Sequence, residues 1–171
     1  MMLIESALLI EVPEAEPVIG HWRTLLDPAA LIGVPAHVTV LYPFLAPNRL
    51  DEATLRLLGS LFRNVHPFPF ALTEVRRWPD FVYLTPEPRE PFADLTEMLV
   101  RHWPDAKPYE GKFDRTVPHV TVAHTSNDAV AQRIIADVSP YLPLDSVAQT
   151  VTLMVTDSVS WTAHTTFLLG A

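Results

Sequence analysis

The sequence predicts an α+β fold built from two similar halves, and three observations support this. Seventeen prolines divide the 171-residue chain into short elements. Strand-like and helix-like patterns alternate along it, in the order β-α-β-α-β followed by β-α-β-α-β-β. The tetrapeptide His-Val-Thr-Val occurs once in each half, at residues 37–40 and 119–122. We therefore expect an internal duplication, with lobes of roughly residues 1–80 and 81–171 packed together as one domain.

Five elements are expected in the first half. Residues 7–12 form an apolar run that ends at a proline, which indicates a buried strand. Residues 18–26 have apolar side chains at helical spacing, and residues 36–42 indicate a strand closed by proline. An aspartate can cap a helix over 51–62, and 68–77 is a strand candidate whose proline favours the edge of a sheet. The apolar face of the first helix is expected to contain Val18, Ile19, Trp22, Leu25 and Leu26.

The second half repeats this plan and adds a strand. Residues 81–85 are short and β-prone, and the helix expected over 92–102 follows a proline suited to a first helical turn. Residues 118–125 indicate a strand, and an asparagine can cap the helix expected over 127–138. The last two strands are expected at 150–156, where apolar residues alternate with threonines, and at 161–169.

Composition limits the class of protein. Hydrophobic residues make up 49% of the chain, enough for a substantial core. Twelve basic and 20 acidic residues give a net charge of −8, which disfavours long nucleic acid but allows one or two phosphates in a small pocket. The chain has no cysteine, which excludes disulfides and a thiol nucleophile. The sequence shows neither a targeting signal nor a membrane span, so we expect a cytoplasmic protein.

Each tetrapeptide combines an imidazole, a hydroxyl and two valines. Alternate residues of a strand face one side, so His37 and Thr39 are expected to share a face opposite the valines. His119 and Thr121 repeat this arrangement in the second half. A third His-x-Thr sequence begins at His164, but it lies near the end of the last strand, where we expect a solvated or structural residue. The repeated tetrapeptide is therefore the candidate functional motif.

The two motifs resemble the signature of the 2H phosphoesterase superfamily, which is a pair of His-x-Thr/Ser-x sequences. This superfamily includes bacterial RNA 2′,3′-cyclic phosphodiesterases and 2′-5′ RNA ligase-like proteins. The surrounding sequences HVTVLYPF and PHVTVAH are similar to the contexts of the first and second family motifs. The resemblance implies a bilobal α+β fold, in which two pseudo-symmetric halves with antiparallel-rich sheets flank a central groove that holds both motifs.

The resemblance also implies metal-independent opening of 2′,3′-cyclic phosphates by two histidines. Histidine can accept or donate a proton near pH 7, so His37 and His119 would be the acid–base pair, with their roles open. Thr39 and Thr121 would donate hydrogen bonds to the phosphate. The same pair could run in reverse and join RNA ends through a 2′-5′ linkage. Neither motif adds carboxylates at metal-ligand spacing, so no cofactor is expected.

Three further residues are candidates for lining the substrate site: Tyr42, Arg115 and His124. Tyr42 follows the first motif and could stack on a base, with core packing as the alternative. Many family members have a basic residue shortly after the second motif, where this chain has His124, and Arg115 just upstream could compensate. His119 and His124 are five residues apart, which in a regular strand places them on opposite faces and disfavours a zinc site.

The expected ligand is a small nucleotide or an RNA end that carries a cyclic phosphate. One alternative is a non-catalytic module that uses the same groove to hold a nucleotide or another phosphorylated ligand. A second is a structural domain whose motif histidines are core residues. Two intact motifs favour the enzyme, because a binding module has no need for two histidines beside one phosphorus.

Overall fold

The computed structural model of the protein describes residues 4–112 and 117–170. Its strands, in chain order, are β1 (Ser6–Glu11), β2 (His37–Leu41), β3 (Phe68–Trp78), β4 (Phe81–Glu87), β5 (Val120–His124), β6 (Leu144–Ala148), β7 (Thr150–Thr156) and β8 (Trp161–Leu168). Its α-helices are α1 (Glu16–Leu26), α2 (Pro28–Leu31), α3 (Glu52–Arg63), α4 (Glu90–His102) and α5 (Asp128–Val138). Short 3-10 helices are η1 (Pro13–Ala15), η2 (Pro47–Arg49), η3 (Pro108–Gly111) and η4 (Ser139–Tyr141). Every expected strand and helix is present, and β6 and the short α2 are additional.

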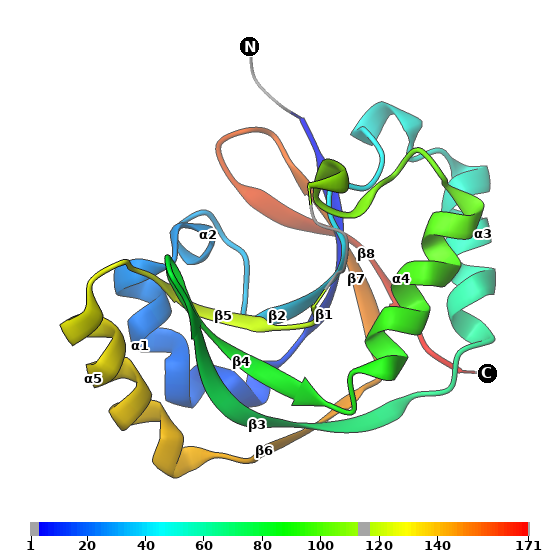
Figure 1. Cartoon of the computed structure of the whole chain (residues 1–171). Coiled ribbons are helices and arrows are strands. Elements are labelled where there is room, and N and C mark those ends of the chain that lie inside the picture. Colours follow the sequence, from blue (N-terminus) through cyan, green and yellow to red (C-terminus); the bar gives the residue numbers. More distant parts are fainter. Residues whose placement is uncertain (1–3, 113–116, 171) are drawn as a thin grey trace.

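The strands form two four-stranded antiparallel sheets of equivalent design (Figure 1). One has the order β2-β1-β7-β8 and the other the order β5-β4-β3-β6. In each sheet the motif strand, β2 or β5, is an edge strand, and it pairs with the first strand of its own half. The α+β class with two pseudo-symmetric antiparallel sheets is therefore confirmed.

The sheets do not follow the two halves of the sequence. Strand β3 from the first half pairs with β4 and β6, and β7 from the second half pairs with β1. The reason is that only two residues connect β3 to β4, so these strands form an antiparallel hairpin. A boundary near residue 80 would cut this hairpin. Pro69 lies in an internal strand, but it is paired only with β6, because pairing with β4 begins at Ala71.

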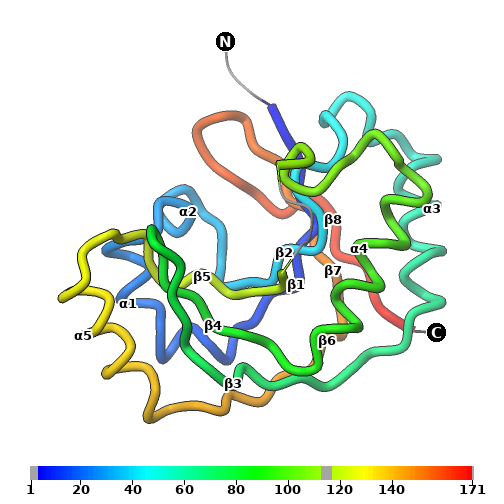
Figure 2. Tube along the Cα trace, viewed as in Figure 1, coloured from blue at the N-terminus to red at the C-terminus, as the bar shows by residue number. Residues whose placement is uncertain are grey.

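The helices tie the two halves together. Helices α1 and α5 pack against the sheet that contains β5, whereas α3 and α4 pack against the sheet that contains β2 (Figures 1 and 2). Helix α1 of the first half therefore covers the motif strand of the second half, and α4 does the reverse. One continuous hydrophobic core draws on both sheets. Each sheet is therefore covered by one helix from each half of the sequence.

Helix α1 differs from its expected apolar face at two positions. Leu25 is 69% exposed, whereas Arg23 is only 3% exposed. Arg23 lies four residues after the buried Ile19, so the two side chains point to the same side of the helix. A buried guanidinium requires partners, and these prove to lie next to the first motif.

A β-bulge interrupts the first motif. The neighbouring residues Leu8 and Leu9 of β1 pair with Leu41 and Thr39 of β2, which leaves Val40 as an extra residue. An extra residue in one strand shifts the alternation of side chains by one position. Residues before and after Val40 therefore do not follow one simple alternation.

The second motif carries the same bulge. The neighbouring residues Val82 and Tyr83 of β4 pair with Ala123 and Thr121 of β5, so Val122 is the extra residue. Val122 is the last valine of its tetrapeptide, as Val40 is in the first. The pseudo-symmetry of the fold thus extends to a local irregularity of the backbone.

Helix α4 stabilises the first bulge through one buried hydrogen bond. The Thr96 hydroxyl donates to the carbonyl oxygen of Val40 at 2.7 Å. We expect Thr96→Val to lower the free energy of unfolding by about 1–3 kcal/mol, because it leaves a buried acceptor without this donor. Thr96→Ser keeps the hydroxyl and should recover most of this loss, as urea denaturation would measure. Equal stability of Thr96→Val and wild type would show that the bond does not stabilise the bulge.

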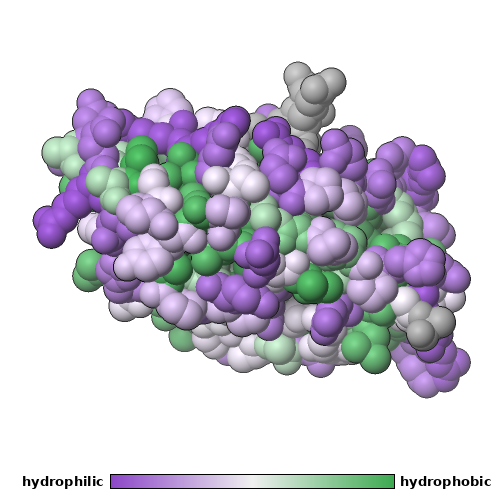
Figure 3. Space-filling model, turned by 90° about the horizontal axis from the view of Figure 1, so that it is seen from below, coloured by the Kyte–Doolittle hydropathy of each residue, from purple (hydrophilic) through white to green (hydrophobic). Residues whose placement is uncertain are grey.

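The surface seen from below has polar side chains with separate groups of apolar ones between them (Figure 3). No helix in residues 4–112 and 117–170 is long and apolar enough to cross a membrane.

Candidate active site

The two motif histidines are held by the same hydrogen bond. His37 Nδ1 lies 2.7 Å from the carbonyl oxygen of Pro35, and His119 Nδ1 lies 2.8 Å from that of Val117. A carbonyl oxygen only accepts hydrogen bonds, so Nδ1 carries the proton and donates it in both rings. In each neutral ring Nε2 is then the proton-accepting nitrogen.

The faces of the two motifs agree with the expected alternation. All four motif valines are buried, whereas both histidines and both threonines are only partly buried. Strands β2 and β5, the edge strands of the two sheets, are in contact and lie side by side (Figure 2). The two imidazoles are close enough for the charge of His119 to lower the pKa of His37. The fold therefore brings together two histidines that are far apart in the sequence.

Burial shifts both histidines toward the neutral form. It lowers the pKa of His37 from 6.5 to about 4, against the opposing effect of the hydrogen bond to Pro35. The Arg23 charge lowers the pKa of His37 further, whereas Asp27 raises it. Burial is also the main cause of the lowered pKa of His119, to which the charge of His124 contributes. A bound anion would raise both pKa values, because it stabilises the imidazolium form.

Tyr109 reaches the first motif from a distant segment. Its side chain is hydrogen-bonded with that of Thr39, and its backbone N–H donates to the carbonyl oxygen of Tyr42 at 2.6 Å. Burial raises the pKa of the Tyr109 phenol. Tyr109 and Glu110 have φ angles of 50° and 58°, in the left-handed region that few non-glycine residues adopt. No sequence pattern singles out Tyr109, because its role depends on how η3 meets β2.

The bulge at Val122 moves His124 to the face of His119. The expectation that these histidines face opposite sides is wrong, because the extra residue shifts the alternation. The Phe81 ring lies near both imidazoles, with ring centroids 5.6 Å from His119 and 5.7 Å from His124. The residue five positions after each motif histidine, Tyr42 or His124, thus shares the face of its motif.

Tyr42 is fixed by packing and by one hydrogen bond. Its hydroxyl donates to Glu5 Oε2 at 2.6 Å, and burial together with this carboxylate raises the pKa of the phenol. Its ring makes edge contacts with Tyr109 at 6.4 Å and with Trp161 at 6.0 Å. Tyr42 therefore supports the Thr39 side of the motif through Tyr109.

Three aromatic side chains of the β3–β4 hairpin surround His119. The ring centroids of Trp78, Phe81 and Tyr83 lie 5.4, 5.6 and 5.8 Å from that of the imidazole. Tyr83 is buried and directly opposite Thr121 in the sheet, whereas Trp78 and Phe81 are partly exposed. Aromatic faces of this kind can stack on nucleobases. In the sequence, Phe81 and Tyr83 are two residues apart in an expected strand, a spacing that places both rings on one face.

The remaining candidates from the sequence are Arg115, His124 and His164. Arg115 lies outside the described residues. His124 Nε2 is 3.9 Å from Asp27 Oδ1, so it faces the end of α1. His164 is exposed, and its Nδ1 lies 2.8 Å from the hydroxyl of Thr165. The described residues contain no group of three or more His, Asp or Glu side chains that could hold a metal ion.

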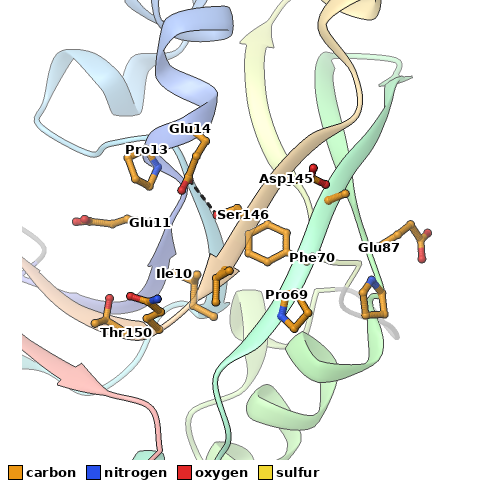
Figure 4. Close-up of a pocket in the computed structure, with 14 residues that line it drawn as sticks. Ile10, Glu11, Pro13, Glu14, Pro69, Phe70, Glu87, Asp145, Ser146 and Thr150 are labelled. Carbon is orange, nitrogen blue, oxygen red and sulfur yellow. Dashed lines mark hydrogen bonds between the residues drawn. The ribbon is translucent and has the colours of Figure 1, made fainter.

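A cavity of about 760 Å³ has none of the motif residues in its lining (Figure 4). It is formed by the end of β1, η1, the start of β3 and β6, and four carboxylates line it: Glu11, Glu14, Glu87 and Asp145. None of the described residues that line it is a lysine or an arginine, and Glu14 accepts a hydrogen bond from Ser146 at 2.9 Å. This negative lining would repel a phosphate. The candidate active site is therefore the motif pair and not this cavity.

Two sheets that each present an edge strand with a His-x-Thr motif define the two-histidine class of phosphoesterase folds. The chain belongs to the 2′-5′ RNA ligase superfamily, whose family model matches residues 11–159. The resemblance suggested by the two tetrapeptides is thereby confirmed.

Individual relatives agree with this membership. A predicted phosphoesterase of Bacillus licheniformis is 27% identical over 164 residues, which cover 91% of this chain and 92% of that protein. A predicted phosphoesterase of Geobacillus kaustophilus is 29% identical over 146 residues and covers 80% of each chain. The crystal structure of E. coli LigT with 3′-AMP matches with a TM-score of 0.65 and 19% identity over 98% of each chain. A Thermus thermophilus structure matches with a TM-score of 0.66 and 19% identity over 96% and 97% of the chains. The structural matches confirm the fold.

Proposed function

We propose that this protein is a metal-independent phosphodiesterase that opens 2′,3′-cyclic phosphates on small nucleotides or RNA ends. One observation carries the proposal. Two histidines on adjacent edge strands have their Nδ1 protons donated to backbone carbonyls, which leaves both Nε2 atoms for proton transfer. Two such groups supply the base and the acid that hydrolysis of a phosphodiester needs.

The proposed reaction is an in-line attack of water. His37 Nε2 accepts a proton from water as the water oxygen forms a bond to phosphorus. Protonated His119 donates its Nε2 proton to the leaving ribose oxygen as the phosphorus–oxygen bond breaks. The product is a phosphomonoester beside a free hydroxyl group, and the two histidines return to their starting states by proton exchange with solvent. Each proton transfer is typically worth about 10²–10⁴-fold in rate.

The different surroundings of the two histidines support these roles. Burial, with a smaller contribution from the Arg23 charge, lowers the pKa of His37 to about 4, so this ring is neutral before substrate binds and can accept a proton. Among the residues that the structure describes, the charge that lowers the pKa of His119 is that of His124 and not that of an arginine. His37 is therefore assigned as the base and His119 as the acid. Thr39 and Thr121 share the faces of these rings and would donate hydrogen bonds to the non-bridging phosphate oxygens.

A small nucleotide is the proposed substrate. The net charge of −8 disfavours a long polyanion, whereas the aromatic side chains beside His119 offer a surface for one base. Structures of E. coli LigT were determined with 3′-AMP, ATP and NADP+, which supports a ligand of this size.

Phosphorus NMR tests the proposal, because a cyclic phosphate and the 2′- and 3′-monoesters give separate signals. Wild type would be incubated with 2′,3′-cyclic mononucleotides and with an oligonucleotide that ends in a cyclic phosphate. His37→Ala and His119→Ala, purified in the same way, control for contaminating nucleases. We expect turnover that EDTA does not reduce and that both variants lower by at least about 10²-fold. Absent turnover in wild type, or turnover that survives both substitutions, would contradict the proposal and favour a binding module.

A further inference from the structure

We propose that Arg23 and Glu16 of α1 are positioning residues for His37. Their hydrogen bonds hold the backbone segment to which the imidazole is bound. The proposal rests on the proposed function insofar as His37 acts in catalysis. The geometry itself can be measured without any activity.

The two side chains fix the segment on both sides of Pro35. The Arg23 Nη2–H donates to the carbonyl oxygen of Val34 at 2.8 Å. Glu16 Oε1 accepts a hydrogen bond from the backbone N–H of Ala36 at 2.7 Å. Between these two points lies the Pro35 carbonyl that accepts the Nδ1 proton of His37. Any movement of residues 34–36 would therefore turn the imidazole and displace Nε2.

Arg23 is itself fixed by two carboxylates. Its Nε donates to Asp27 Oδ2 at 3.0 Å, and its Nη1 lies 3.4 Å from Glu16 Oε1. Arg23 and Asp27 are each only 3% exposed. Asp27 also accepts a hydrogen bond from the backbone N–H of Ala29 at 3.1 Å and lies near His124. The cluster thus links α1, the segment before β2 and His124, which lies two residues after the second motif.

Stability alone is a weak explanation for this cluster. Buried ion pairs often contribute little or nothing compared with apolar residues of similar size. The same face of α1 accommodates the fully buried Ile19, so an apolar side chain would fit the packing. What an apolar residue cannot do is donate to the Val34 carbonyl and at the same time hold Glu16, the acceptor for the Ala36 N–H, in a defined geometry. A planar guanidinium with several fixed donors can meet that requirement.

Arg23→Lys tests the geometry, because it keeps the positive charge near His37 but loses the fork that reaches several acceptors. Nitrogen-15 NMR reports which ring nitrogen of His37 carries the proton. We expect wild type to show the Nδ1–H tautomer and Arg23→Lys to show a mixture with Nε2–H. The variant should lower kcat about 10–100-fold with little change in KM, since a displacement of about 1 Å can cost that much. Arg56→Lys, at a helical position 75% exposed, is the matched control and should change neither measurement.

A second pair of variants covers the case in which Arg23→Lys does not fold. Glu16→Gln keeps an oxygen that can accept from Ala36, whereas Glu16→Ala removes it. We expect Glu16→Ala to change the tautomer of His37 and to lower kcat, and Glu16→Gln to behave nearly as wild type. An unchanged Nδ1–H tautomer in Glu16→Ala and in folded Arg23→Lys would overturn the proposal. A wild-type protein without turnover would contradict the proposed function only, because the NMR measurement decides the positioning role by itself.

Discussion

His37→Asn and His119→Asn are each expected to lower kcat for a 2′,3′-cyclic nucleotide by about 10²–10⁴-fold and to leave the fold intact. Asparagine can still donate a side-chain N–H to the carbonyl of Pro35 or Val117, so the backbone contact of Nδ1 is imitated. It has no counterpart of Nε2 and cannot transfer the proton. The double variant should be less impaired than the product of the two single effects, because groups that act as a unit are not additive.

A change of leaving group separates the two roles. A nucleoside 4-nitrophenyl phosphodiester releases a weakly basic phenolate that needs no proton from the enzyme. His119→Asn should therefore lose little activity on this substrate, whereas His37→Asn should remain impaired because water still requires a base. Steady-state kinetics with both substrates, at equal protein concentration and with circular dichroism to confirm folding, gives the comparison. Rescue of His37→Asn instead of His119→Asn would reverse the assignment, and equal loss on both substrates would contradict acid catalysis by His119.

The pH dependence of kcat/KM is expected to be bell-shaped, with its maximum below pH 6.5. The productive free enzyme has one neutral and one protonated histidine, and kcat/KM reports the free enzyme. The pKa of His37 is about 4 and that of His119 is lowered from 6.5, so this form is most abundant between about 4 and 6.5. Above the maximum the acid is deprotonated, and below it the base is protonated. Each limb should approach a tenfold change per pH unit.

The profile of kcat should reach its maximum at a higher pH than that of kcat/KM. A bound phosphate anion favours the imidazolium forms and raises both pKa values in the complex. Initial rates from about pH 3 to 9 at constant ionic strength, with substrate far below and far above KM, measure the two profiles. A flat kcat/KM between pH 5 and 8 would contradict the acid–base pair. A maximum above pH 7 would show that burial does not keep these histidines neutral in the free enzyme.

The amino-acid sequence determined much of this protein through local rules. Apolar periodicity, prolines and capping residues were sufficient for eleven strands and helices, because these signals act over a few neighbouring residues. Asp51 and Asn127 cap α3 and α5 as expected, with hydrogen bonds of 2.8 Å to Thr54 and 3.1 Å to Val130. The repeated tetrapeptide pointed to the family and to the two candidate histidines, because the same four residues at equivalent places in both halves can be recognised without a structure.

The tertiary structure decided which strands pair and which residues share a face. Whether β7 joins β1 or its own half depends on contacts between distant segments, which no local pattern contains. Regular strand alternation predicted that His119 and His124 lie on opposite faces of β5. The bulge at Val122 places them on the same face, because a single extra residue shifts every later side chain. Arg23 and Tyr109 likewise became visible only when the chain folded. Arg23 binds the backbone carbonyl of Val34, where residue type gives no signal. Tyr109 binds Thr39, which is far away in the sequence.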